Sequence, residues 1–156
     1  KDLPRAESEA RIAATDQYNR TPAQVLLAQA MAQQERAAEA LSLAAEIERD
    51  AQERHEGAVE SLELVRGDAL ARMQRYDEAV AAFQHEIATF PRNRQAYASL
   101  YIVYMLMGKP AEAHATLEAL VKASPNQRTR AFAASTADVV GDHDAAAVWR
   151  RRAQRK

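Results

Sequence analysis

A segment of this sequence returns in register 34 residues later. The segment QRYDEAVAAFQHEIATFPRN, residues 74–93, aligns with GKPAEAHATLEALVKASPNQ, residues 108–127. The shift places Ala79 on Ala113, Phe83 on Leu117 and Pro91 on Pro125. Self-similarity at a period of a few tens of residues is typical of chains built from stacked supersecondary units. The repeat therefore predicts an array of equivalent units.

The composition predicts that these units are helical. Ala, Glu, Leu, Gln and Arg dominate the sequence and favour helix, whereas Val, Ile and Thr are too few for many strands. Apolar residues make up 47% of the chain, which suits a folded globular protein. Short breaks separate the helical segments, so successive helices should be antiparallel neighbours.

The apolar spacing and the breaks predict eight helices after a lead-in helix. Thr21 is expected as the N-cap of the first, with Pro22 at its first helical position and Gln24 completing a capping box. The expected helices have these apolar stripes or limits: Val25–Met31, Ala40–Ile47, Leu62–Met73, Tyr76–Phe90, Asn93–Gly108, Ala113–Val121, Arg128–Val140, and Asp144 to the end.

Two units carry a motif that resembles the tetratricopeptide repeat. Residues 60–93 show Gly67, Arg75–Ala79, Phe83 and Pro91, and residues 94–127 continue the pattern. The second unit has the following matching residues: Tyr97, Leu100, Tyr104, Gly108, Ala113 and Pro125. Residues 21–52 and 128–156, the latter with GDHDAAAVW, resemble degenerate units. The resemblance implies an all-α, right-handed α-solenoid of antiparallel helix pairs over residues 21–156, preceded by a lead-in helix in residues 1–20.

The chemistry of the repeated positions supports the same fold. Ala79 and Ala113 are small enough for two helices to cross closely, and Phe83 and Leu117 fill the space between units. A single unit cannot bury its apolar face alone, so stacking must make the core.

No pattern in the sequence predicts catalysis. There is no cysteine, no phosphate-binding loop and no nucleophile motif, and the histidines are far apart. The stretch GDHD, residues 141–144, is interpreted as a turn with an N-capping Asp rather than a metal or acid–base site. We therefore expect no enzyme activity, no cofactor and no metal. No apolar run is long enough for a membrane span.

The charges are unevenly placed, although the net charge is only −1. Acids exceed bases in residues 1–60, and bases exceed acids afterwards, ending in RRRAQRK. This tail is interpreted as a solvated terminal helix rather than a nucleic-acid or membrane contact, because no aromatic residues alternate with the bases. We expect no nucleic-acid partner.

The resemblance implies that a concave groove binds a peptide or a partner helix. The expected groove residues are Leu64, Asp68, Arg72, Ala98, Ile102 and Met105. The lysines and asparagines with which part of this family grips a terminal carboxylate are missing, which argues against that ligand. A mixed apolar groove suits an amphipathic helix or another part of the same protein, and residues 5–17 are a further candidate to fill it. Asp68 and Arg72 are alternatively expected to pair with each other.

The main functional hypothesis is a non-catalytic scaffold for protein–protein interaction. The alternative is a C-terminal accessory or regulatory module of a larger enzyme, because the chain starts at Lys1 without Met and resembles, over a few residues, the junction to such repeats in bacterial sulfatase-like hydrolases. Self-association through an exposed apolar face is a third expectation. The composition suggests a bacterial source, and a soluble protein of the cytoplasm or the periplasm fits equally well.

Overall fold

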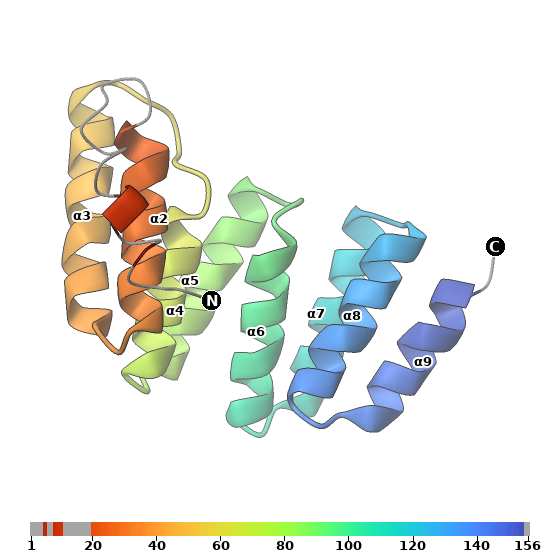
Figure 1. Cartoon of the computed structure of the whole chain (residues 1–156). Coiled ribbons are helices and arrows are strands. Elements are labelled where there is room, and N and C mark those ends of the chain that lie inside the picture. The colour runs from red at the N-terminus through yellow and green to blue at the C-terminus, as the bar shows by residue number, and fades with distance from the viewer. Residues whose placement is uncertain (1–4, 6–7, 11–19, 155–156) are drawn as a thin grey trace. The chain divides into compact units, whose positions relative to one another are not determined.

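The computed structural model describes residues 5, 8–10 and 20–154, and all the regular elements of these residues are helices (Figure 1). The helices are α2 (Arg20–Gln33), α3 (Ala37–Glu53), α4 (Leu62–Arg72), α5 (Tyr76–Thr89), α6 (Arg94–Leu106), α7 (Pro110–Ala123), α8 (Gln127–Val139) and α9 (His143–Gln154). The predicted all-α class is confirmed. The helices α2, α4, α6 and α8 are the first members of successive hairpins and are called A helices below; their partners are the B helices.

The proline and glycine signals place the helix ends where the sequence predicted them. Helix α5 ends before Pro91, and Pro110 occupies the first turn of α7. The expected capping Asp is present, since Asp142 Oδ1 accepts a hydrogen bond of 3.1 Å from the backbone N–H of Ala145 at the start of α9.

The prediction for the start of α2 was wrong. The helix begins at Arg20, so Thr21 lies within the first turn. Its hydroxyl instead accepts a bond of 2.8 Å from Arg54 Nη2 and donates one of 3.3 Å to Glu56. These partners lie in the loop after α3, and a local capping rule does not take distant partners into account.

Each A helix passes to its B helix through the same left-handed turn. The residues with positive φ are Glu35 (63°), Gln74 (60°), Gly108 (69°) and Gly141 (76°). In every case the next residue's N–H reaches back five residues to a carbonyl of the A helix, as in a Schellman motif. The four bonds are Arg36 to Met31 (3.1 Å), Arg75 to Leu70 (2.9 Å), Lys109 to Tyr104 (2.9 Å) and Asp142 to Ala137 (3.0 Å). The hairpins are therefore equivalent at the level of single backbone bonds.

A buried alanine follows each of these turns. Ala40, Ala79, Ala113 and Ala146 are the fourth residues of α3, α5, α7 and α9, and each is 0% exposed. A side chain with no atom beyond Cβ lets the B helix approach its neighbours closely, and anything larger would overpack the contact.

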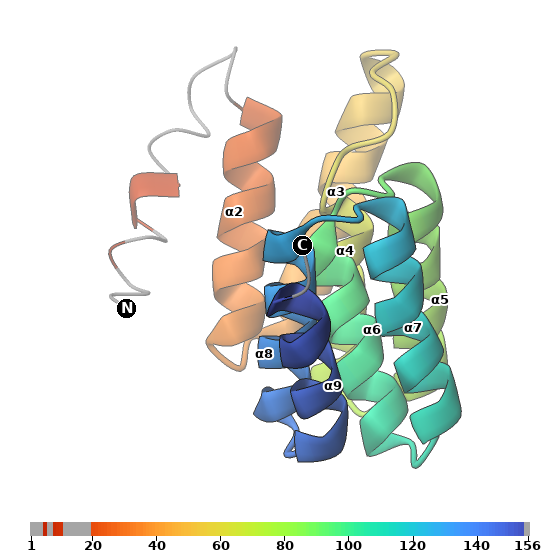
Figure 2. The ribbon, with the colours of Figure 1, turned by 90° about the vertical axis from the view of Figure 1, so that its right-hand side faces the viewer.

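The chain divides into two compact units, Lys1–Ala82 and Phe83–Lys156, which are described separately. In the first unit α3 packs on α2 and α4, and α2 also packs on α4. Their shared core includes Ala28, Met31, Ile47 and Val65. Ala10 is buried in the same core, and Figures 1 and 2 place residues 8–10 beside α2.

In the second unit α7 packs on α6 and α8, α8 packs on α6 and α9, and consecutive helices run antiparallel (Figure 2). Tyr101, Leu117 and Leu120 are fully buried at the centre. Trp149 of α9 is buried in the same core as Ala133 and Ala137 of α8. Helix α7 runs antiparallel to both α6 and α8. Helices α6 and α8 therefore run parallel to each other, and their equivalent ends lie side by side.

Candidate functional site

In the first unit, the three expected groove residues lie on α4 at four-residue intervals. Leu64 is buried, Asp68 is half-buried and Arg72 is exposed at the last position of the helix. Residues spaced by four on a helix share one face. The α4 face therefore changes from apolar at its start to charged at its end.

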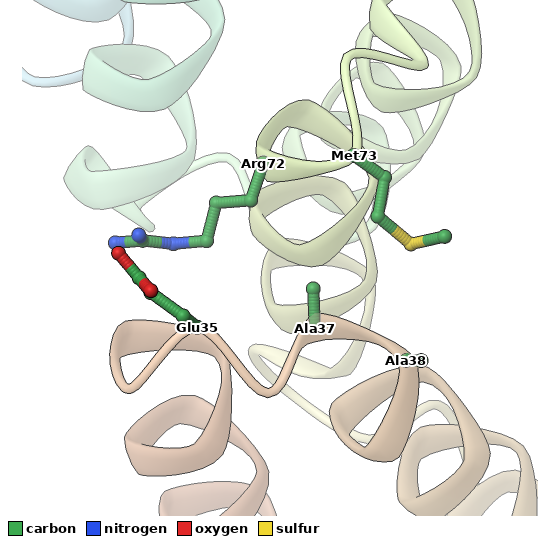
Figure 3. Close-up of a pocket in the computed structure, with 5 residues that line it drawn as sticks. All are labelled: Glu35, Ala37, Ala38, Arg72 and Met73. Carbon is green, nitrogen blue, oxygen red and sulfur yellow. The ribbon is translucent and has the colours of Figure 1, made fainter.

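A hollow of about 450 Å³ lies where this charged end meets the turn between α2 and α3. It is lined by Glu35, Ala37, Ala38, Arg72 and Met73 (Figure 3). The carboxylate of Glu35 and the guanidinium of Arg72 point toward one another at its rim. Met73 is 42% exposed and extends on the other side, above Ala38. The hollow joins a charged rim to an exposed apolar side chain.

A second hollow of about 360 Å³ lies in the same unit between the start of α2 and the loop that precedes α4. Its apolar lining includes Pro22, Val25, Leu26 and Val59. Leu26 is 59% exposed, so an apolar surface is open to solvent here.

In the second unit, the expected groove residues lie on α6. Ala98 is buried, and Ile102 and Met105 are partly buried against the core of the unit. Counted from the left-handed residue of each turn, however, the position equivalent to Arg72 is Leu106, not Met105. Leu106 is 62% exposed, whereas Met105 packs inward.

The same count identifies Val139 as the equivalent residue of α8, and it is 74% exposed. Leu106 and Val139 are the last residues of two parallel, contacting A helices. Large apolar side chains exposed at neighbouring equivalent positions form a patch rather than scattered exceptions. We call Ile102, Leu106 and Val139 the apolar end of the α6/α8 face.

Three polar side chains from distant parts of the second unit contact one another. Asp142 Oδ2 accepts a bond of 2.8 Å from the Tyr101 hydroxyl and one of 2.6 Å from His114 Nε2. The rings of Tyr101 and His114 are stacked with centroids 6.4 Å apart. The cluster joins α6, α7 and the turn before α9, and no sequence spacing predicted it.

The cluster shifts the pKa values of Tyr101 and Asp142. Burial, together with the bond to Asp142, raises the pKa of Tyr101 well above its usual range. For Asp142 burial acts most strongly and in the upward direction, but the bonds from His114, Tyr101 and Ala145 together outweigh it and lower the pKa. A carboxylate held ionised by three donors stabilises the packing of these elements.

Two further features of the described residues bear on function. No group of three or more His, Asp or Glu side chains is placed to hold a metal ion within residues 5, 8–10 and 20–154. None of the helices in this part of the chain has the length and apolar character needed to cross a membrane.

Repeated antiparallel hairpins, with identical turns and buried alanines, define the class of α-solenoid proteins. Residues 70–137 match the family model described as tetratricopeptide repeat. A search of curated proteins finds no match. The repeats and this match show that residues 70–137 are tetratricopeptide repeats.

Solved structures with the same fold include three that cover almost all of this chain. The thermophilic tetratricopeptide-repeat protein TTC0263 of Thermus thermophilus is 16% identical, with a TM-score of 0.72 over 97% of this chain and 81% of its own. A tetratricopeptide-repeat protein of Parabacteroides merdae is 18% identical, with a TM-score of 0.67 over 98% and 58%. The MamA protein is 18% identical, with a TM-score of 0.60 over 97% and 86%. At these identities the similarity concerns the fold.

Proposed function

We propose that this protein is a non-catalytic scaffold that binds a partner protein through the exposed faces of its A helices. The fold and the family are those of protein-interaction scaffolds. The observation that carries the proposal is the exposure of Leu106 (62%) and Val139 (74%) at equivalent positions of neighbouring helices. Exposed apolar patches on soluble proteins mark interaction sites, since their burial in a complex removes apolar area from water.

An amphipathic helix is the partner that this surface fits best. The apolar end of the α6/α8 face includes Ile102, which is only partly covered by the unit's own core. A helix presents apolar residues every three or four positions and can fill such a surface with one stripe. On the first unit, the hollow beside Arg72 offers a polar contact next to Met73.

A random peptide display library selected on the purified chain tests this proposal. Enriched peptides should carry apolar residues at helical spacing, and the variant Leu106→Asp/Val139→Asp should lose them. Val148→Asp is the matched control, because Val148 is an exposed apolar residue (36%) of α9, which is a B helix. No enrichment above an empty support, or enrichment that the double variant leaves unchanged, would refute the proposal.

The other expectations stand as further proposals. One of them is that another segment of the same chain occupies the groove in place of a separate partner. Ala10, which precedes the first repeat, is buried in the core of the first unit. Residues 5–17 were a further candidate to fill the groove, and of these residues 6, 7 and 11–17 lie outside the described residues. The link to a larger hydrolase rests on the first residues of the chain, which are also outside them. Self-association through the apolar end is tested by sedimentation at two concentrations.

A further inference from the structure

Cations collect at one end of the second unit, opposite its apolar end. The residues are Arg92, Arg94, Lys122, Arg128, Arg130 and Arg151, and we call them the cationic end. They come from the starts of α6 and α8, the loop before α6, and the ends of α7 and α9. Since consecutive helices of this unit are antiparallel, these termini lie at the same end.

The cationic end is not neutralised by acids of its own unit. The sequence has no Asp or Glu between Glu86 and Glu112, and none between Glu118 and Asp138. None of the six cations has an ion-pair partner within the described part of the chain. The two nearby acids are engaged elsewhere: Glu86 is fully buried with the Asn93 amide on it, and Glu118 pairs with Arg152.

Two helix N-termini add to this positive potential. Neither α6 nor α8 has an acidic residue in its first turn. The partial positive charges of both helix starts therefore add to the arginines instead of being offset. Elsewhere the chain does offset such charge: Arg20 at the start of α2 pairs with Asp50, and α4 carries Glu63 in its first turn.

The two ends of the same face thus differ in chemistry. The N-terminal ends of α6 and α8 are cationic, and their C-terminal ends carry Leu106 and Val139. Arg94 connects the two helices at the cationic end, with its guanidinium 5.2 Å from the centre of the Phe132 ring. A ligand that lies along α6 and α8 contacts positive charge at the N-terminal ends of these helices and apolar side chains at their C-terminal ends.

We propose that the α6/α8 face selects a peptide segment with acidic residues at one end and an apolar stripe at the other. Charge complementarity identifies this occupant, because unpaired exposed arginines gain a partner only from an anionic ligand. The apolar end favours a peptide over a nucleic acid, since phosphates and sugars would leave Leu106 and Val139 uncovered. The inference rests on the proposed function and adds the chemistry and direction of the ligand.

The test is the same peptide selection, with charge as the readout. Enriched sequences should contain acidic residues on one side of the apolar stripe. The variant Arg92→Glu/Arg128→Glu should weaken binding of an enriched peptide by about tenfold, and added salt should weaken wild-type binding more than binding of this variant. Both arginines are exposed, and circular dichroism checks that the variant folds. Arg49→Glu, at an exposed position of α3, should bind as wild type.

The outcomes separate this inference from the proposed function. If enriched peptides show no acidic excess, or bind the Arg92→Glu/Arg128→Glu variant as tightly as wild type, the charge inference is wrong while binding at the apolar end stands. If a single-stranded RNA oligonucleotide binds more tightly than the peptides and depends on the same arginines, a nucleic-acid ligand replaces the peptide. If the library yields no binder, both proposals fail together.

Discussion

The hydroxyl of Tyr101 on α6 donates a hydrogen bond of 2.8 Å to Asp142, which lies in the turn between α8 and α9. Both side chains are shielded from solvent, and Tyr101 is completely buried. The bond therefore ties the last hairpin to the one before it. Counted back from the left-handed residue of each turn, Tyr101 is equivalent to Ala28 and Gly67 of the earlier repeats. A large side chain thus stands where the earlier repeats have a small residue, and its hydroxyl extends as far as the turn of the next hairpin.

Removal of this bond should destabilise the protein. Tyr101→Phe keeps the ring but leaves the buried carboxylate with one donor fewer, and hydrogen bonds to charged groups contribute about 1.5–3 kcal/mol. The free energy of unfolding in urea is the measurement. Tyr97→Phe is the matched control, because its hydroxyl donates only a 3.3 Å bond to the Pro91 carbonyl. Equal losses in both variants would contradict a special role for Asp142.

The lowered pKa of Asp142 predicts a dependence of stability on pH. Because the folded protein binds this proton less readily than the unfolded chain, the stabilisation is complete above the ordinary pKa of 3.8 and is lost as the pH falls below it. Asp142→Asn keeps an oxygen for the Ala145 N–H but has no charge to lose. The difference in Tm between wild type and this variant should shrink from about pH 5 to about pH 2. Glu46→Gln, an exposed site on α3, should show no such trend.

The left-handed turns predict stabilising substitutions. Gln74 and Glu35 hold positive φ with a Cβ, which costs roughly 1–2 kcal/mol relative to glycine before the extra chain entropy of glycine is counted. Gln74→Gly and Glu35→Gly should each raise the stability by about 0.5–1 kcal/mol. Gly108→Ala and Gly141→Ala should lower it, although nothing lies within 4 Å of the added carbon. Urea midpoints of the four variants check both signs, and a destabilising Gln74→Gly would show that its side chain matters more than its backbone.

The buried alanines should tolerate no larger side chain. Ala113→Leu adds atoms where α7 has no free space, and overpacking of this kind costs about 1–3 kcal/mol. Ala115→Leu makes the same change two residues away on the exposed face of α7 and should be nearly neutral. Thermal unfolding of the pair separates packing from helix propensity. Comparable Tm values would mean that the helices can separate at Ala113 without loss.

Much of the helical layout could be predicted from the sequence because local signals determine it. Pro91, Gly108 and Gly141 each mark an end that the backbone itself enforces, and the predicted limits lie close to those observed. The interpretation of GDHD as a capped turn was right for the same reason, since Asp142 bonds a backbone N–H three residues away.

The errors arose where a side chain's partner lies far along the chain. Thr21 has the identity of a cap, but Arg54 and Glu56 engage its hydroxyl. His114 and Asp142 are 28 residues apart and meet only because α7 lies against the last hairpin. Met105 was expected because it continues the helical spacing of Ala98 and Ile102, whereas the 34-residue shift that places Gln74 on Gly108 places Arg72 on Leu106.

Every turn between paired helices is closed by a backbone hydrogen bond from within its own hairpin. The gain or loss of one complete hairpin would therefore leave the backbone bonds of the remaining turns intact. The number of hairpins is consequently the property that this architecture can change with least disturbance. A single residue inserted into an A helix before its turn would instead rotate every exposed position of that helix toward a different neighbour.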